Sequence, residues 1–477
     1  MRERQKRQTL LIWLKNILSL CSIFTIGAVL IFIIQGWTIN SNGEPIRTGL
    51  VQFATNISGS VVEVGDKTLS ERTNTKTQLA PGEYEFKMWS EGYETWYRKT
   101  SVAASEVLWL NYARLVPKEK KTETFLQLED LKAIKFAKNG QKALAITENA
   151  DKIAHFWLIE LADSPRITEV SFPENLFNRK LEENETYLQN VAENLSIDEL
   201  NEDATRAILK WQNGENANWL AVNLSNTAES RNLTSDFSVN ISKIVARDKN
   251  HNSFFALTDG ELREISLGNS TISANLLNNL VDFEKYNENI LAFVQKNDQG
   301  KFTAGIFERG RSDTALIAQN LNSQPKIAIG RYYSENYLHV LNGETLQIYK
   351  GDSWIGGNQP RIYKTLTLDF VAEGFSLNEE MRFLKISSSE KTQIYDLETN
   401  SKYVLNGGGF AWLDNFILYN FQNHQLMMRD FDGSNVQGIF EIEPEFGAKL
   451  SNNERYIYGI SKNESGIFEL KRVRMRI

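Results

Sequence analysis

The residue types that most often do chemistry are few and scattered in this 477-residue chain. Its four histidines, His155, His251, His339 and His424, lie far apart in the sequence, and none belongs to a His-Glu-x-x-His pair. No Gly-x-Ser-x-Gly nucleophile elbow, Walker loop or dinucleotide-binding glycine fingerprint occurs. We therefore expect structural histidines, and we predict no catalytic residue, no cofactor and no metal ligand.

The acidic residues give two weaker signals. The run Asp430-Phe431-Asp432-Gly433 begins like a calcium loop, but it lacks the spaced carboxylates and the distal Glu that complete such a site, so a hairpin turn is favoured. A pair of carboxylates that cleaves a glycosidic bond stays open, because the sequence does not reveal which of its 60 acidic residues face a cleft.

Aromatic side chains suggest a binding surface between residues 84 and 109. Trp96 and Tyr97 are adjacent and could stack on sugar rings if they lie in a loop. The competing interpretation, which we favour, places Tyr84, Trp89 and Trp109 in a core or an interface, because a small β domain needs large side chains to fill it.

Ahead of these residues lies an apolar segment that could cross a membrane. Ile17 to Ile34 is uncharged throughout, and 18 residues of helix rise about 27 Å, close to the hydrocarbon thickness of a bilayer. Trp13 and Trp37 bracket it, as interfacial indoles do. The run is longer than a typical signal-peptide core and no Ala-x-Ala site follows it, so we predict a cytoplasmic segment at 1–16 and an uncleaved signal anchor at 17–37.

Charge around the anchor sets its direction. No charged residue follows it before residue 44, whereas its N-terminal side is basic with a single acid, Glu3. This asymmetry predicts a single-pass protein of the cell membrane with a cytoplasmic N-terminus, the bulk of the chain extracytoplasmic and the lipid bilayer as its partner. The residues that predict this orientation are Arg2, Arg4, Lys6, Arg7 and Lys15.

Two bulk properties of the chain agree with this predicted location. Residues 1–15 carry a net charge of +4, so the remainder carries −11 of the total of −7, and an acidic ectodomain does not suit nucleic acid. The only cysteine, Cys21, lies within the apolar segment and lacks the small residue before it that a lipoprotein site requires. We therefore expect no intramolecular disulfide and no lipid modification.

Residues 38–117 alternate short β-rich runs with turns, which predicts a small β-sandwich. Strands are expected around Leu50–Ala54, Val61–Val64, Tyr84–Trp89 and Val107–Leu110. Pro81 and Gly82 suit the central positions of a type II turn, because proline presets φ and glycine accepts a positive φ.

This segment resembles the PEGA domain. The resemblance rests on Leu-Ala-Pro-Gly-Glu-Tyr-Glu-Phe followed by Glu-Gly-Tyr, while the tetrapeptide that names the family is replaced by residues 57–60. It implies a small β-sandwich of bacterial or archaeal surface proteins, commonly beside a membrane anchor, and it implies no defined ligand. The residues that carry it are Pro81, Gly82, Tyr84, Gly92 and Tyr93.

Residues 118–477 contain a repeat: an apolar residue, a small polar residue, an Asn or Asp turn, then an aromatic and aliphatic strand. It begins at Phe136, Leu200, Phe375 and Leu450, with weaker copies between them. Roughly eight units of about 44 residues are typical of four-strand propeller blades. The units resemble TolB-type and WD-like propellers, and we predict seven or eight blades, with eight preferred. Residues 175–202 are long for a connection, which favours a projecting loop or short helix.

These patterns define a mainly β chain: a transmembrane helix, a PEGA-like sandwich and a propeller. We expect a membrane-anchored, extracytoplasmic binding or scaffold protein without enzymatic activity, whose partner is a cell-wall glycan or an envelope protein. Two alternatives stay open: a propeller hydrolase or lyase that acts on envelope glycans through axial carboxylates, and a subunit of an envelope protein complex.

Overall fold

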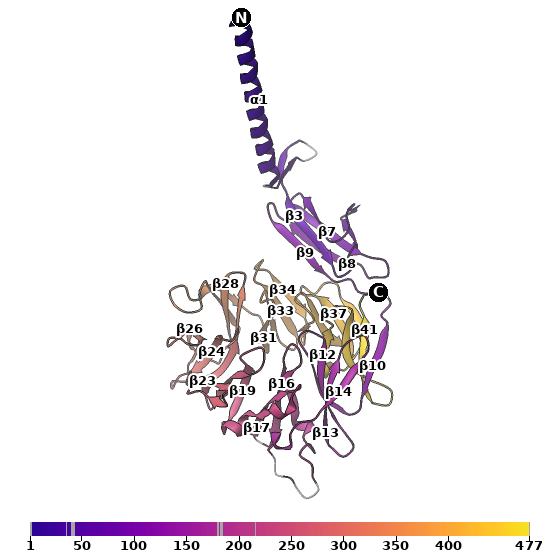
Figure 1. The fold of residues 1–477 in the computed structure, drawn as a ribbon, viewed down its shortest axis with the longest axis vertical. Helices are drawn as coiled ribbons and strands as arrows, with labels where there is room; N and C mark the ends of the chain where they lie inside the picture. Colours follow the sequence, from indigo (N-terminus) through magenta and orange to yellow (C-terminus); the bar gives the residue numbers. More distant parts are fainter. Residues whose placement is uncertain are drawn as a thin grey trace. The chain divides into compact units, whose positions relative to one another are not determined.

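A computed structural model describes residues 2–34, 36–39, 43–178, 181, 185–214 and 216–476. The chain divides into two compact units, Met1–Glu119 and Lys120–Ile477 (Figure 1). The division falls two residues beyond the expected boundary at residue 117, inside the charged run that joins the two β regions.

The first unit begins with helix α1, Arg2–Ile34. Its segment Trp13–Phe32 is the one described helix that is long and apolar enough to cross a membrane, and none of this segment is buried within the chain. The expected span to Trp37 is too long, because Gly36 has a φ of +74° and Trp37 already belongs to strand β1, Trp37–Ile39. Strand β1 pairs antiparallel with β2, Pro45–Arg47.

Two sheets form the sandwich of the first unit. In the first sheet, β3 pairs antiparallel with β6 and parallel with β9; in the second, β7 lies between β4 and β8. Their inward side chains pack together, with Phe53 and Phe86 rings 5.7 Å apart and both buried. The strands are β3 Gly49–Thr55, β4 Val61–Val64, β5 Lys67–Thr68, β6 Thr75–Leu79, β7 Gly82–Trp89, β8 Trp96–Val102 and β9 Val107–Ala113.

The second unit is a β-propeller, whose described residues form eight four-stranded antiparallel sheets. In seven of these sheets the four strands are neighbours in chain order. The first three sheets are β11 Leu131–Phe136, β12 Lys142–Glu148, β13 Ala154–Glu160 and β14 Arg166–Val170; β15 Leu195–Leu200, β16 Arg206–Asn213, β17 Asn216–Asn223 and β18 Arg231–Asn232; and β19 Ile241–Ala246, β20 Ser253–Thr258, β21 Glu261–Ser266 and β22 Thr271–Ile272. The next four are β23 Leu280–Lys285, β24 Ile290–Lys296, β25 Phe302–Glu308 and β26 Ala315–Leu321; β27 Lys326–Tyr332, β28 Glu335–Asn342, β29 Thr345–Gly351 and β30 Arg361–Thr367; β31 Gly374–Leu377, β32 Phe383–Ser387, β33 Lys391–Asp396 and β34 Lys402–Asn406; and β35 Ala411–Trp412, β36 Ile417–Gln422, β37 Gln425–Asp430 and β38 Gln437–Glu441.

The remaining sheet joins the two ends of this unit. Its order is β10-β41-β40-β39, so the first strand of the propeller pairs with the last. Arg472 of β41 forms an ion pair with Glu123 of β10 at 3.0 Å and lies over the rings of Phe125 and Tyr456. The next residue, Val473, is fully buried, so the two side chains point to opposite faces of β41. The strands are β10 Thr122–Leu128, β39 Ala448–Leu450, β40 Tyr456–Lys462 and β41 Phe468–Arg474.

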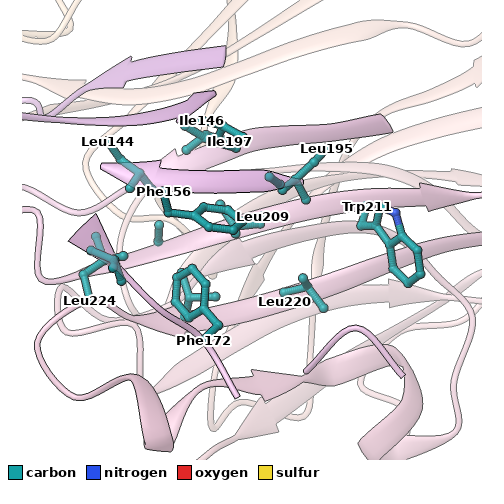
Figure 2. Packing of buried hydrophobic residues seen from close by; sticks show 14 of the residues in the cluster. Leu144, Ile146, Phe156, Phe172, Leu195, Ile197, Leu209, Trp211, Leu220 and Leu224 are labelled. Carbon is teal, nitrogen blue, oxygen red and sulfur yellow. The ribbon is translucent and has the colours of Figure 1, made fainter. Parts of the chain in front are cut away.

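Central strands are buried on both faces because each sheet is covered by its neighbours. All six residues of β20 are buried, and six of the seven residues of β12 are buried. Figure 2 shows one such layer, in which Phe156 of the first sheet packs toward Leu209 and Leu220 of the second. One blade could not bury these faces alone, so the ring is the stable unit.

For the segment before β15 a projecting loop or short helix was expected, and its described part contains two short helices, Glu174–Leu176 and Ala192–Asn194, with buried side chains. Phe177, Val191 and Ala192 are buried in the layer between the first two sheets, and Asn232 Nδ2 donates to Leu176 O at 3.0 Å. Residues 195–200 are strand β15 itself. The described part of this segment is therefore held by apolar burial. The short helices of the unit are η1 Glu174–Leu176, η2 Ala192–Asn194, η3 Thr227–Glu229, α2 Leu233–Phe237 and η4 Pro444–Phe446.

The sheet β10-β41-β40-β39 completes the ring, and we call it the closing sheet. A cavity made in its buried face should therefore lower the free energy of unfolding strongly. Leu470 of β41 is fully buried, whereas Leu316 of β26 is 43% exposed. We expect Leu470→Ala to lower the free energy of unfolding by about 2–5 kcal/mol, and Leu316→Ala by less than about 0.5 kcal/mol. Urea denaturation of the full chain in detergent, followed by near-ultraviolet circular dichroism, measures both. Equal costs at the two leucines would contradict the ring.

Candidate functional site

The first strands of neighbouring propeller sheets contact one another, so they are the innermost strands. The loops that leave four of these strands line a cavity of about 660 Å³, called the mouth below. The mouth takes Lys138 from the β11–β12 loop, Glu202 from β15–β16, residues 247–251 from β19–β20 and residues 286–289 from β23–β24.

The loops of the mouth are built by the repeat seen in the sequence. Asn201 Oδ1 accepts hydrogen bonds from Thr205 N at 2.9 Å and Arg206 N at 2.8 Å. Asn287 Oδ1 accepts them from Asn289 N and Ile290 N, each at 2.9 Å. These Asx turns bond the backbone locally, so the chain reverses between the first and second strands of a sheet at each such position.

Glu199 of β15 is a carboxylate of the mouth that contacts the neighbouring sheet. Its Oε2 accepts a hydrogen bond from Ala246 N at 3.2 Å, and His251 Nε2 lies 3.3 Å from its Oε1. Burial acts to raise the pKa of Glu199, but the contacts with His251 and Ala246 outweigh it and hold that pKa below its ordinary value. The carboxylate is therefore kept ionised.

Lys285 and Asp248 complete the buried part of the mouth. Lys285 Nζ donates to Ala246 O, and burial lowers the pKa of Lys285 despite its attraction to Glu199 and Asp248. The Ser253 hydroxyl donates to Asp248, which also accepts from Asn252 N at 3.2 Å, and these bonds lower the pKa of Asp248 against the effect of burial.

Ion pairs continue along the inner strands. Lys243 of β19 donates to Asp282 Oδ1 at 2.9 Å and Glu284 Oε1 at 2.7 Å, and its pKa is raised because these attractions outweigh burial. Burial raises the pKa of Asp198 on β15, while the nearby Lys135 opposes that shift. The interior near the mouth thus combines both signs of charge.

The pKa shifts of the mouth can be compared with those that glycoside hydrolysis requires. A hydrolase of glycosidic bonds needs a general acid whose pKa is raised. Glu199 and Asp248, the two carboxyl groups of the mouth whose pKa is shifted, are both shifted downward. Among the described residues, no group of three or more His, Cys, Asp or Glu side chains could hold a metal ion. The mouth can offer charged and amide contacts to a ligand that carries both donors and acceptors.

The structure separates the four histidines. His251 belongs to the mouth, a role that sequence reasoning missed, although its place in an Asp-led β19–β20 turn was a signal. His339 is fully buried beside Tyr337, and burial lowers its pKa to about 4. His424 is exposed, 3.7 Å from Glu443. His155 lies on β13, away from the mouth.

The predicted hairpin at Asp430–Gly433 is found between β37 and β38.

The predicted aromatic surface of the first unit is half wrong. Trp96 is 2% exposed and packs edge-on against Tyr112 at 5.7 Å, because its register opposite Met88 turns it into the sandwich. Its neighbour Tyr97 points outward and is 39% exposed. Trp89 and Trp109, for which a core or an interface was expected, are 37% and 42% exposed.

The PEGA-like residues occupy the two ends of β7 and do not form one site. Tyr84 donates to Ala80 O at 2.9 Å, while Gly92 has a φ of +81° and Tyr93 is buried next to Pro117. The type II turn expected at Pro81 and Gly82 is wrong, because Gly82 has no positive φ and starts β7 by pairing with Val102.

The orientation residues all belong to α1. Lys15 is exposed on the helix surface. The side chains of Arg2, Arg4, Lys6 and Arg7 lie outside the described residues, so their predicted role in orientation stays a prediction.

Comparisons with known proteins agree with this architecture. Residues 48–118 match the model of the PEGA domain family, which confirms the resemblance for that segment. A comparison with curated protein sequences found no match. The chain therefore combines an N-terminal apolar helix, a PEGA domain and a β-propeller.

Solved structures similar to the chain include several propeller-bearing or related proteins. A prolyl endopeptidase is 9% identical, with a TM-score of 0.45 over 74% of this chain, which spans 55% of that protein's length. A eukaryotic initiation factor is 10% identical, with a TM-score of 0.38 over 69% of this chain and 93% of its own. Dihydro-heme d1 dehydrogenase NirN is 12% identical, with a TM-score of 0.41 over 65% of this chain and 66% of its own.

The lowered pKa of Glu199 makes a prediction about stability and pH. A carboxyl group whose pKa is lowered on folding stabilises the fold above its ordinary pKa of 4.5, and that contribution is lost as the pH falls through the lowered value. We expect Glu199→Gln to cost about 1 kcal/mol at pH 7, since the side chain is partly solvated, and progressively less below pH 4.5.

Urea denaturation of the full chain across this pH range measures the effect. Glu202→Gln is the matched control, because Glu202 is exposed and belongs to the β15–β16 loop, which lines the same mouth. A cost at Glu199 that does not change with pH, or an equal cost at Glu202, would contradict the assigned contacts.

Proposed function

We propose that this chain is a membrane-anchored, extracytoplasmic binding and scaffold protein. Helix α1 would hold it in the bilayer, the PEGA domain would lie next to the membrane or cell wall, and the propeller would present its mouth to a partner. The apolar segment Trp13–Phe32, preceded by basic residues, supports the anchor and its direction. The partner would be an envelope protein or a cell-wall glycan.

The observation that carries the proposal is the charge of the mouth. Its half-buried charges already have partners: Glu199 contacts His251, Asp248 accepts from Ser253, and Lys285 donates to a carbonyl oxygen. Groups held in this way supply oriented contacts for a ligand, whereas a general acid would need a carboxyl group with a raised pKa. Binding without catalysis is therefore favoured over glycan hydrolysis.

The topology can be tested with single cysteines in a Cys21→Ser background. We expect Ser465→Cys, in the exposed β40–β41 turn, to react with a membrane-impermeant maleimide in intact spheroplasts. Gln5→Cys should react only after the membrane is permeabilised. The reverse pattern would contradict the orientation, and a mature protein lacking residue 5 by mass spectrometry would mean that the apolar segment is a cleaved signal.

The binding role can be tested by photocrosslinking in living cells. We expect a photoreactive amino acid at Asn289, exposed in the mouth, to form a discrete adduct with an envelope component. The same amino acid at Gln299, exposed in the β24–β25 turn, is the control and should form none. The adduct should disappear in a Lys285→Gln variant that folds normally.

Two results would contradict this role. Equal adducts from Asn289 and Gln299 would show contact without a defined site. The absence of adducts at both positions, together with turnover of envelope glycans by the purified full chain, would favour the hydrolase.

A further inference from the structure

The outer face of the sheet β6-β3-β9 in the PEGA domain carries an exposed tryptophan among uncharged polar side chains. Alternate residues of each strand point outward, and the pairing of the strands sets them in rows. In one row, Trp109 of β9 lies beside Gln52 of β3, which lies beside Lys76 of β6. We call this surface the Trp109 face, and its outward residues are Leu50, Gln52, Lys76, Gln78, Val107, Trp109 and Asn111.

The side chain of Trp109 is accessible and uncommitted. It is 42% exposed, and Val107, two positions earlier on the same strand, is 43% exposed. Within the described part of the chain, no hydrogen bond or ring contact engages the indole of Trp109. Its N–H can therefore donate to a ligand while its ring offers an apolar surface.

The polar side chains of the Trp109 face are mainly amides. Gln52, Gln78 and Asn111 each carry a donor and an acceptor, and no other described residue makes a hydrogen bond with them. Lys76 is the single charged residue among the seven. The face is thus almost free of charge, although the chain as a whole is 24% charged.

The opposite outer face of the domain provides a contrast. Trp89 of β7 is 37% exposed, but its Nε1 already donates to Glu63 Oε1 at 2.8 Å. Lys87, on the same face, lies opposite Glu63 in the pairing of β7 with β4. Trp89 therefore has a similar exposure but a bonded N–H and charged neighbours.

The chemistry of the Trp109 face selects among possible partners. A stable protein interface buries about 800 Å² on each side around several apolar anchors, whereas Trp109 and Val107 are the two strongly exposed apolar residues of this face. A lipid surface would desolvate three amide side chains without giving them partners. The apolar face of a sugar ring can stack on an indole, and its hydroxyl and acetamido groups pair with amides that both donate and accept.

We propose that the Trp109 face binds a neutral glycan chain, with one sugar ring stacked on Trp109 and its polar groups bonded to Gln52 and Asn111. The proposal deepens the wall contact suggested for the PEGA domain and rests on the extracytoplasmic location proposed above. Binding by the purified chain is measured independently of that location, so a failure of either proposal can be recognised separately.

The test measures binding of two tetrasaccharides to the full chain by isothermal titration calorimetry. The probes are tetra-N-acetylchitotetraose and cellotetraose, and the detergent is lauryldimethylamine oxide, which has no sugar headgroup to compete. We expect both probes to bind, and Trp109→Ala to weaken binding at least about tenfold. Trp89→Ala is the matched control and should bind as the unaltered chain does.

A second variant covers the case in which Trp109→Ala fails to fold. Gln52→Leu keeps a side chain of similar length in the row but removes its donor and acceptor, so we expect binding to weaken by about fivefold. Because the ligand is neutral, binding should not change between about 0.05 and 0.5 M salt.

Several outcomes would overturn the proposal. Binding of neither tetrasaccharide would show that the face is not a glycan site. Equal losses in Trp109→Ala and Trp89→Ala, or no loss in folded Trp109→Ala, would place the contact elsewhere. Binding that weakens steeply with added salt would mean that charge, and not the uncharged face, recognises the ligand.

Discussion

The pairing of β10 with β41 is the constraint on which the rest of the propeller depends. It joins residues near 122 to residues near 474, and it covers the outer faces of the first and last sheets at one seam. Without it, strands such as β12 would lose apolar cover on one face. Closing so long a loop has an entropic cost, which is offset because burial along the ring becomes continuous.

The ion pairs of the inner strands follow from that closure. Charged side chains from β15, β19 and β23 converge along the inner strands, where each is partly withdrawn from water and is paired. Lys243 therefore contacts both Asp282 and Glu284, and Glu199 lies against His251. Although the chain is acidic overall, the charges of these inner strands are paired, and the mouth contains both positive and negative side chains.

Much of the fold could be predicted because it is encoded locally. The Asn-centred turns at Asn201 and Asn378 were visible in the sequence, and each side chain bonds backbone amides within a few residues. Register was harder, since a shift of one position moves a side chain to the other face of a sheet. For that reason a surface position stayed open for Trp96, which is buried, and a core or an interface was favoured for Trp89 and Trp109, which are exposed.

The amino-acid sequence by itself determined the apolar helix, the two β regions, the turn repeat and the PEGA-like segment, because these depend on composition and on neighbours along the chain. Only the tertiary structure decided which charges meet. Glu199 and His251 come from different sheets, and so do Lys243 and Asp282. Such contacts depend on how the sheets close into a ring, which pairs residues distant in sequence, and no local pattern specifies that closure.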